Sequence, residues 1–437
     1  MNKKTKALIP ALLAVAIAVS MGIFIPQMTK EDLTLRILAS DNSEIAVITS
    51  DGYDGEYSAF CEKVQSQVTE ILGEDAEGTY TVESTFVKNA FDSCKNAYEQ
   101  TGARINSFAQ VVTTTDGQIL SIFSSGATNE NYALTKTQPY SSFKPLSVYA
   151  PALENGKITW ASSFTDSPVK QIADEDGKLS DWPANATGEY RNTDVSLDEC
   201  LKYSLNTAAV RCLMQSGVAD SVSFVEEKFG IDVNSEKEQM SLKGEEEILH
   251  NIALGYLTAG VSPVDMAGFY QIFATGGKYT EPYAVKTIRD ENGNVIYEHK
   301  SETKQIISEE TAYIMNLLLQ NTLTQGGTAE KAFVEGIKTG GKTGTGSNYS
   351  GNWFIGYTPE YVCSIWHGQN QKNICTETYS HLRRGLEHDS TKDFPSCPTV
   401  TLKVYCKDSG GMLSLNCNSM ATGYFPSGCV LDKCKIH

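Results

Sequence analysis

The stretch QPYSSFKP, residues 138–145, places Ser141 and Lys144 three positions apart at the start of an apolar segment with helical spacing. One helical turn brings positions i and i+3 to the same face, so the lysine amine can reach the serine hydroxyl. A serine hydroxyl is a weak nucleophile until a neighbouring base takes its proton. A lysine can be that base where burial and a nearby positive charge keep it neutral. The stretch therefore predicts a helix that carries a serine nucleophile and its base.

Two further motifs follow this stretch along the chain. Ser204 and Asn206 flank Leu205 in a segment with helical spacing, and residues 341–345 read GKTGT. The second motif adds a hydroxyl and an amide, and the third adds a second lysine among small residues. The specific signal is the ordered set of three motifs, each in a plausible structural context.

Each motif is weak when taken alone. Serine-x-x-lysine recurs at Ser167 and at Ser301, and a second lysine-threonine-glycine begins at Lys338. We prefer Lys342 to Lys338 because only Lys342 has both a preceding glycine and a further threonine, Thr345, after the motif.

The order of the expected strands and helices indicates an α/β fold of the α+β type. A hairpin is expected where residues 109–113 and 118–124 flank the turn Asp116-Gly117. The middle of the chain is mostly helical, and later strands are expected near residues 285–288, 295–299, 341–345, 352–357 and 361–366. Strands early and late around a helical middle predict an antiparallel sheet flanked by helices, with a mostly helical subdomain inserted.

Composition divides the chain into four expected segments. Residues 1–30 are expected to be a cytoplasmic tip and membrane anchor, 31–79 a stalk or pedestal, 80–396 the main domain and 397–437 a cysteine-rich tail. The stalk contains one expected amphipathic helix, residues 57–72, with apolar side chains at every fourth position.

The N-terminal segment has the pattern of a membrane anchor. Lys3, Lys4 and Lys6 precede residues 7–26, twenty positions without a charged side chain. That length can span a bilayer, and the lysines place the N-terminus in the cytoplasm. A cleaved signal peptide is the alternative. In either case we expect the body of the chain outside the cell membrane.

The charge balance argues against one class of partner. The chain has 437 residues and a net charge of −17. Proteins that bind nucleic acids favour basic stripes, so no nucleic-acid partner is expected.

Cysteine is concentrated in the tail, where five of the eleven cysteines fall within residues 397–437. This usage fits an oxidising compartment, so disulfides are the preferred interpretation. Free thiols and a zinc site are the alternatives, although no C-x2-C spacing supports zinc. The residues available to a metal would be Cys406, Cys417, Cys429, Cys434 and His437.

The three motifs in this order resemble those of the penicillin-binding protein transpeptidase family. The resemblance extends to residues 253–255 and 261–267, and it covers roughly residues 80–437. The tail is similar to the C-terminal end of Gram-positive bifunctional (class A) members. Those members carry a glycosyltransferase domain, for which residues 31–79 leave no room, so that activity is expected to be absent. A separate glycosyltransferase is then an expected partner.

The resemblance implies a role for each residue of the first two motifs. Ser141 would attack the carbonyl of a D-Ala-D-Ala peptide bond, with Lys144 as the base. Ser204 could relay the proton to the leaving amine, and Asn206 could hydrogen-bond the backbone of the donor peptide. The alternative for Asn206 is a helix cap.

The third motif would bind the terminal carboxylate of the substrate. Lys342 would supply positive charge and favour the neutral form of the first lysine, while Thr343 and Thr345 would offer hydroxyls. Gly344 would let the strand approach the ligand without a side chain in the way. The backbone N–H groups of Ser141 and Thr345 would form the oxyanion hole. No metal and no cofactor are required.

The function implied by the resemblance is that of a membrane-anchored D,D-transpeptidase. It would cross-link peptidoglycan stem peptides through a serine acyl-enzyme and would be acylated by β-lactams. The alternatives are a D,D-carboxypeptidase, a β-lactamase in which Glu247 would activate water, and a β-lactam-binding or wall-binding scaffold without activity.

Overall fold

The computed structural model describes residues 32–50, 52–101, 105–173, 177–346, 351–368 and 374–437. The expected membrane anchor, residues 7–26, lies outside these ranges. Within them, no helix combines the length and the apolar character that crossing a bilayer requires.

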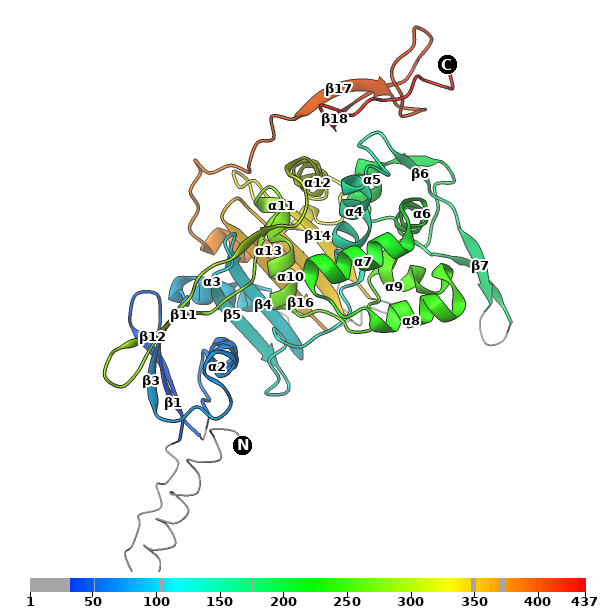
Figure 1. Ribbon diagram of the computed structural model, residues 1–437. Coiled ribbons are helices and arrows are strands. Elements are labelled where there is room, and N and C mark those ends of the chain that lie inside the picture. Colours follow the sequence, from blue (N-terminus) through cyan, green and yellow to red (C-terminus); the bar gives the residue numbers. More distant parts are fainter. Residues whose placement is uncertain (1–31, 51, 102–104, 174–176, 347–350, 369–373) are drawn as a thin grey trace, which may run out of the picture.

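A five-stranded antiparallel sheet forms the centre of the main domain (Figure 1). The strand order is β14-β15-β16-β4-β5. The expected early hairpin and the expected late strands therefore pair in one sheet, which confirms that part of the sequence prediction. The strands are β14 (Gly340–Thr345), β15 (Asn352–Tyr357), β16 (Tyr361–His367), β4 (Ser107–Thr114) and β5 (Ile119–Gly126).

Helices cover both faces of this sheet. Side chains alternate along a strand, and in β15 Phe354 joins one hydrophobic core while Trp353 and Ile355 join the other. Helices α3 (Lys88–Gln100) and α13 (Ile374–Gly385) pack on the core that contains Phe354. Helices α10 (Pro263–Phe269), α11 (Gln271–Ala274) and α12 (Glu309–Asn321) pack on the core that contains Trp353 and Ile355.

The chain between β5 and α10 contains the mostly helical region that the sequence predicted. Two small sheets accompany it, β6 (Ser163–Thr165) with β9 (Asp194–Ser196) and β7 (Lys170–Ala173) with β8 (Leu179–Trp182). Its main helices are α5 (Leu197–Lys202), α6 (Asn206–Ser216), α7 (Val218–Phe229), α8 (Asn234–Lys243) and α9 (Leu249–Leu254).

A second five-stranded sheet forms the N-terminal pedestal (Figure 1). It packs against α2 (Ser58–Leu72), the amphipathic helix expected in the stalk. The hairpin β11–β12 comes from the middle of the chain, and β11 pairs with β3. The expected boundary between residues 79 and 80 therefore falls inside β3. The strand order is β12 (Val295–Glu298), β11 (Val285–Arg289), β3 (Thr79–Ser84), β1 (Thr34–Leu38) and β2 (Glu44–Ile48).

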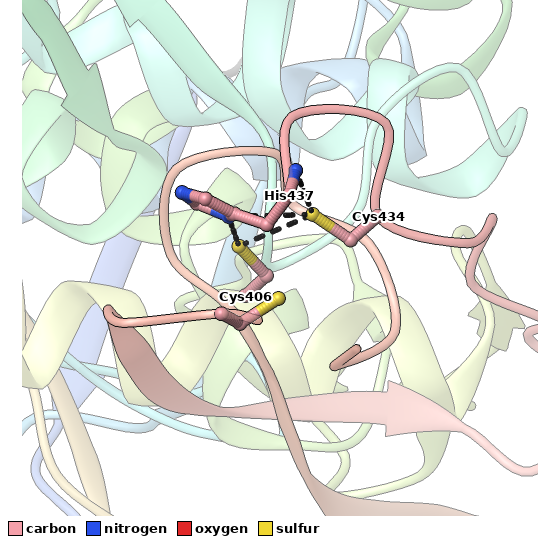
Figure 2. A group of neighbouring side chains, drawn as sticks. Cys406, Cys434 and His437 are labelled. Carbon is pink, nitrogen blue, oxygen red and sulfur yellow. Dashed lines mark hydrogen bonds between the residues drawn. The ribbon is translucent and has the colours of Figure 1, made fainter. Parts of the chain in front are cut away.

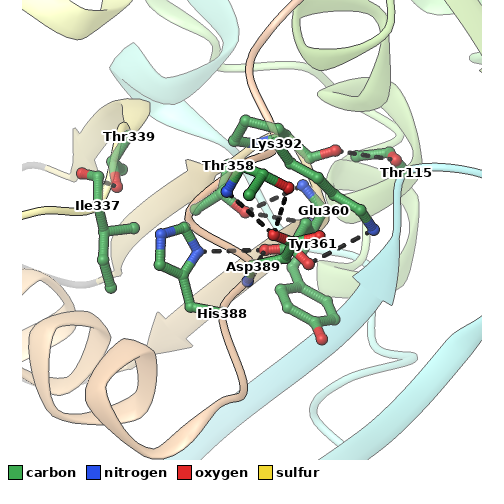
Figure 3. A network of polar contacts seen from close by, with 11 residues as sticks. Thr115, Ile337, Thr339, Thr358, Glu360, Tyr361, His388, Asp389 and Lys392 are labelled. Atoms are coloured by element: carbon green, nitrogen blue, oxygen red, sulfur yellow. Dashed lines mark hydrogen bonds and ion pairs between the residues drawn. The ribbon is translucent and has the colours of Figure 1, made fainter.

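Glu360, in the turn between β15 and β16, anchors the segment that leads from α13 to the tail (Figure 3). Its carboxylate accepts a hydrogen bond from the backbone N–H of Asp389 at 3.1 Å, lies 3.1 Å from His388 Nδ1 and pairs with Lys392 at 3.5 Å. Its backbone carbonyl accepts from the N–H of Thr115 at 3.2 Å. These contacts fix the direction in which the chain leaves the main domain.

The tail forms the hairpin β17 (Val400–Cys406) and β18 (Met420–Pro426), which lies apart from the central sheet (Figure 1). Tyr424 attaches it to the main domain through ring contacts with Trp160 at 5.2 Å and Tyr313 at 6.2 Å. All eleven cysteines lie in the described ranges, and all are free thiols. The preferred disulfide interpretation is therefore wrong for this structure.

Candidate active site

A cleft of about 630 Å³ opens beside β14, which is an edge strand of the central sheet as described. Two of the eight residues predicted for the site, Lys144 and Lys342, lie below its surface with 1% and 0% of their area exposed. The other six line the cleft, and they are Ser141, Ser204, Asn206, Thr343, Gly344 and Thr345. The three sequence motifs therefore meet at one place.

The serine nucleophile predicted from the first motif lies on a tight helical turn rather than on a regular α-helix. A 3₁₀-helix spans Tyr140–Phe143, a π-helix follows over Pro145–Tyr149 and α4 completes the segment at Ala150–Glu154. Positions i and i+3 nearly eclipse in a 3₁₀ turn, so Ser141 and Lys144 still share one side. Irregular turns of this kind are frequent at functional sites.

Two glycines allow this segment to lie directly against its neighbours. A Cβ atom added to Gly255 would lie 2.1 Å from the carbonyl oxygen of Tyr140, and one added to Gly344 would lie 2.6 Å from that of Pro139. Tyr140 has φ of +50°, a strained conformation for a residue with a side chain. Gly344 thus permits close contact with the nucleophile segment, whereas the sequence predicted close contact with the ligand.

Gly344→Ala is expected to lower the rate of acylation by a fluorescent penicillin by about 100-fold, because the added methyl must push β14 away from Pro139 and Ser142, between which Ser141 lies in the sequence. Timed labelling on denaturing gels measures this rate. Gly428→Ala is the matched control, since a Cβ atom there would meet nothing within 4 Å. Acylation of Gly344→Ala at the wild-type rate would show that the close contact is not needed.

Ser204 connects the two buried lysines. Lys144 Nζ donates to the Ser204 carbonyl oxygen at 2.9 Å and to Asn206 Oδ1 at 2.6 Å. Lys342 Nζ donates to Ser204 Oγ at 2.8 Å and to the Thr343 carbonyl oxygen at 3.0 Å. Ser204 itself has φ of +55°, so it is held in an unfavourable conformation at the point where the amines meet.

Both lysines are more acidic than usual. Burial, and after it the charge of Lys342, hold the pKa of Lys144 well below the ordinary value of a lysine. Burial lowers the pKa of Lys342 to about 7. A lysine amine that is neutral near neutral pH can accept a proton, which is the property required of a base for Ser141.

The expected contact between nucleophile and base is not made in this conformation. Among the described residues, the Ser141 hydroxyl takes part in no hydrogen bond, whereas the Lys144 amine is held by the second motif. Such catalytic hydrogen bonds are often long in structures without substrate. Transfer of the serine proton to this amine therefore requires a contact between the two side chains that is not present among the described residues.

Three buried residues that the sequence analysis missed hold the second motif in place. Asn185 Oδ1 accepts a hydrogen bond from the backbone N–H of Asn206 at 2.9 Å, and Asp166 accepts from Asn185 Nδ2 at 2.7 Å and from Thr207 Oγ1 at 2.6 Å. Burial raises the pKa of Asp166, but these bonds and one from the Arg191 N–H outweigh it and leave the pKa lowered. Asp166 and Asn185 lie in a loop-rich region with no sequence signal that could have identified them, whereas Thr207 is the second residue of α6.

Asn206 does not act as the helix cap considered from the sequence. It is the first residue of α6, and Leu205, which precedes it, forms no side-chain cap. The Asn206 side chain instead donates to the Ala184 carbonyl oxygen at 2.7 Å and accepts from the first lysine. It therefore positions the base as well as lining the cleft.

The competing copies of the motifs lie elsewhere. Lys338 is 58% exposed and forms an ion pair with Asp393. Ser167 Oγ accepts a hydrogen bond from Arg211 at 3.0 Å, and Lys170 pairs with Glu246 at 3.1 Å. The choice of Lys342 over Lys338 made from the sequence agrees with this geometry.

Lys338→Ala is expected to leave the rate of penicillin acylation within about twofold of wild type, because an exposed ion pair contributes little. Gel labelling measures both variants side by side, and Lys342→Ala should be strongly impaired. An inactive Lys338→Ala together with an active Lys342→Ala would reverse the choice of third motif.

Comparison with known proteins identifies the class to which this fold and site belong. The family described as penicillin binding protein transpeptidase domain matches residues 107–380, so the chain belongs to the penicillin-binding protein transpeptidase family of peptidoglycan synthesis. The resemblance seen in the three motifs is thereby confirmed.

Among its relatives, the chain is 31% identical over 336 residues to penicillin-binding protein 1F of Bacillus subtilis, covering 73% of this chain and 43% of that one. It is 28% identical over 323 residues to penicillin-binding protein 1A of Clostridium botulinum, covering 72% and 37%. The chain thus spans less than half the length of these relatives. The D,D-transpeptidase domain of a peptidoglycan glycosyltransferase from Eggerthella lenta shares the fold, with a TM-score of 0.64, 19% identity and coverage of 82% and 98%.

Proposed function

We propose that this chain is a D,D-transpeptidase that cross-links peptidoglycan stem peptides through an acyl-enzyme on Ser141. The observation that carries the proposal is the pair of buried lysines beneath the serine, joined through Ser204. β-Lactams, which resemble the acyl-D-Ala-D-Ala unit, would acylate the same serine. No cofactor takes part in this chemistry.

In the acylation step, Ser141 Oγ bonds to the carbonyl carbon of the D-Ala-D-Ala peptide bond, and its proton passes to the neutral amine of Lys144. The proton then passes through Ser204 to the leaving amine, and the terminal D-alanine departs. Ser204 suits this relay because its Oγ accepts from Lys342 and keeps its own hydrogen to donate. Backbone N–H groups of Ser141 and Thr345 stabilise the oxyanion, each worth about 3 kcal/mol.

The third motif orients the donor peptide. Lys342 adds positive charge below the cleft, and Thr343 and Thr345 line the cleft, so their hydroxyls are available to the carboxylate of a substrate. An extended stem peptide can lie along the edge of β14 and pair with its backbone, the mode in which exposed strands bind peptides. In the second step, an acceptor amine replaces the serine oxygen at the acyl carbon and returns a proton to Ser141.

The setting of this activity is also part of the proposal. Residues 7–26 anchor the chain in the cell membrane, with the catalytic domain on the outer side, where the wall is built. Glycan chains are supplied by a separate glycosyltransferase. Protease digestion of intact spheroplasts tests the orientation: the domain should be cleaved from outside.

Hydrolysis is the competing reaction, and the sequence suggested Glu247 as the residue that would activate water. Glu247 forms an exposed ion pair with Lys243 at 3.1 Å and is not among the residues that line the cleft. A role in deacylation therefore lacks support.

The decisive experiment supplies the purified chain with a peptide ending in D-Ala-D-Ala and with a D-amino acid as acceptor amine. Mass spectrometry should find D-alanine release coupled to an amide-linked product, and Ser141→Ala should give neither. Release of D-alanine with only the shortened peptide would indicate a carboxypeptidase. Absence of both products and of penicillin labelling would indicate a binding protein without activity.

A further inference from the structure

Four side chains with metal-binding atoms converge in the tail, and none of them lines the catalytic cleft; Figure 2 shows three of them, Cys406, Cys434 and His437. They are Cys406 at the end of β17, Cys417 in the loop before β18, and Cys434 and His437 in the segment after β18. Their Sγ and Nδ1 atoms all lie within 4.8 Å of one another. Residues separated by up to 31 positions in the sequence therefore share one small volume.

The spacing of three of these atoms matches three corners of a tetrahedron around zinc, and Cys417 Sγ lies within 4.8 Å of all three. The Sγ atoms of Cys406 and Cys434 are 3.7 Å apart, and each lies 3.5 Å from His437 Nδ1. Zinc bonds of about 2.3 Å to sulfur and about 2.0 Å to nitrogen give tetrahedral edges of about 3.8 Å and about 3.5 Å. A disulfide would require its two sulfurs to be about 2.0 Å apart.

The groups around the cluster support coordination by the same atoms. His437 Nε2 lies 3.5 Å from the carboxylate of Asp408, which leaves Nδ1 as the nitrogen for a metal. A carboxylate beside the second nitrogen is the usual partner of a histidine bound to zinc. The backbone N–H of Ser414 points to Cys417 Sγ at 3.2 Å, and that of His437 points to Cys434 Sγ at 3.4 Å.

The tail has little else to stabilise it. Its hydrophobic cluster has only four buried members, Tyr405, Phe425 and Leu431 of the tail and Ala161 of the main domain, and an isolated two-stranded hairpin is marginally stable. Small units of this kind are commonly held by a metal or by disulfides. Three thiols cannot all pair with one another, whereas one zinc ion satisfies all three together with the histidine.

We propose that Cys406, Cys417, Cys434 and His437 bind one Zn²⁺ ion as a structural site that closes the tail onto its hairpin. Three thiolates and an imidazole are a soft ligand set that selects zinc over magnesium or calcium. With four protein ligands the ion has no open position, so its role is structural. The three thiols release their protons to solvent on binding. The tail lacks the C-x2-C spacing typical of zinc sites, but Cys434 and His437 have the equivalent two-residue separation.

The test measures zinc in the full 437-residue chain, purified without chelator, by inductively coupled plasma mass spectrometry. We expect about one zinc ion per chain in the wild type and less than about one tenth of that in Cys434→Ser and in His437→Ala. Cys429→Ser is the matched control: Cys429 belongs to the same tail but not to the four-residue group, so this variant should keep its zinc.

Peptide mapping without reduction separates the alternatives. Wild type without zinc overturns the proposal, whether the digest contains a Cys406–Cys434 disulfide or free thiols. Equal zinc content in wild type and Cys434→Ser overturns it as well. If a variant does not fold by circular dichroism, the wild type decides: zinc removal by a chelator should make residues 397–437 susceptible to protease, and added Zn²⁺ should restore resistance. Unchanged proteolysis after zinc removal would contradict a structural role.

Discussion

Replacing Ser141 with alanine is expected to abolish covalent labelling by a fluorescent penicillin, a loss of more than about 1000-fold, while the fold stays intact. The serine oxygen is the only atom proposed to bond to the antibiotic. Its hydroxyl takes part in no hydrogen bond among the described residues, so its removal leaves no buried group without a partner. A denaturing gel of the labelled chain, with thermal unfolding in parallel, measures both effects.

The neighbouring serine provides the matched control for this experiment. Ser142 Oγ is buried and donates to the carbonyl oxygen of Pro139, so it supports the segment but does not face the cleft. Ser142→Ala should therefore still be labelled, with some loss of stability. Labelling of Ser141→Ala at the wild-type level would show that another residue is the nucleophile.

Lys342→Met is expected to change the pH dependence of acylation as well as its rate. In the wild type, acylation requires Lys144 without its proton and Lys342 with its proton, which gives a bell-shaped profile. The falling limb should lie near pH 7, because burial lowers the pKa of Lys342 to about 7. Above that pH the charge that attracts the carboxylate is lost.

The variant should differ from the wild type in three respects. The rate should fall by about 100-fold or more, since the positive charge below the cleft, which attracts the carboxylate, is removed. The falling limb near pH 7 should disappear. The rising limb should move to higher pH, because the charge of Lys342 helps to lower the pKa of Lys144. Stopped-flow acylation from pH 5 to 9 measures all three, with Lys338→Met as the exposed-lysine control.

The same buried amine makes stability depend on pH. In the unfolded chain, Lys342 keeps its proton up to about pH 10.5. In the folded chain, its pKa is about 7, so it releases the proton near that pH. Between these values unfolding takes up a proton, so the free energy of unfolding rises with pH. From pH 7 to 10, the wild type should gain more than about 1 kcal/mol relative to Lys342→Met. Denaturant unfolding with the same pH slope in both proteins would contradict the lowered pKa.

The sequence predicted the parts of the molecule that depend on local patterns and ordered motifs. The turn at Asp116-Gly117 and the helix of residues 57–72 follow from short-range signals, and the structure contains both. The three motifs could be assigned to one site because their order along the chain resembles a known family. Their geometry then agreed with the choice of Lys342.

The missed features all depend on contacts between distant parts of the chain. Nothing near residues 285–298 shows that this hairpin joins the pedestal, because its partner strand is about 200 residues away. Asp166 and Asn185 support Asn206 through side-chain hydrogen bonds that no periodic pattern encodes. The positive φ of Tyr140 is likewise imposed by its tertiary neighbours, since the residue type alone disfavours it.

The shared pedestal has a consequence for the order in which the molecule is made. Strands β1 and β3 leave the ribosome early, but β11, which pairs with β3, begins about 200 residues later. At 5–20 residues per second, the edge of β3 waits roughly 10–40 s for that partner. An exposed strand edge is a template for pairing with other chains. During synthesis the nascent chain therefore passes through a period in which the edge of β3 is unpaired. This edge needs protection from pairing with other chains until β11 has been synthesised.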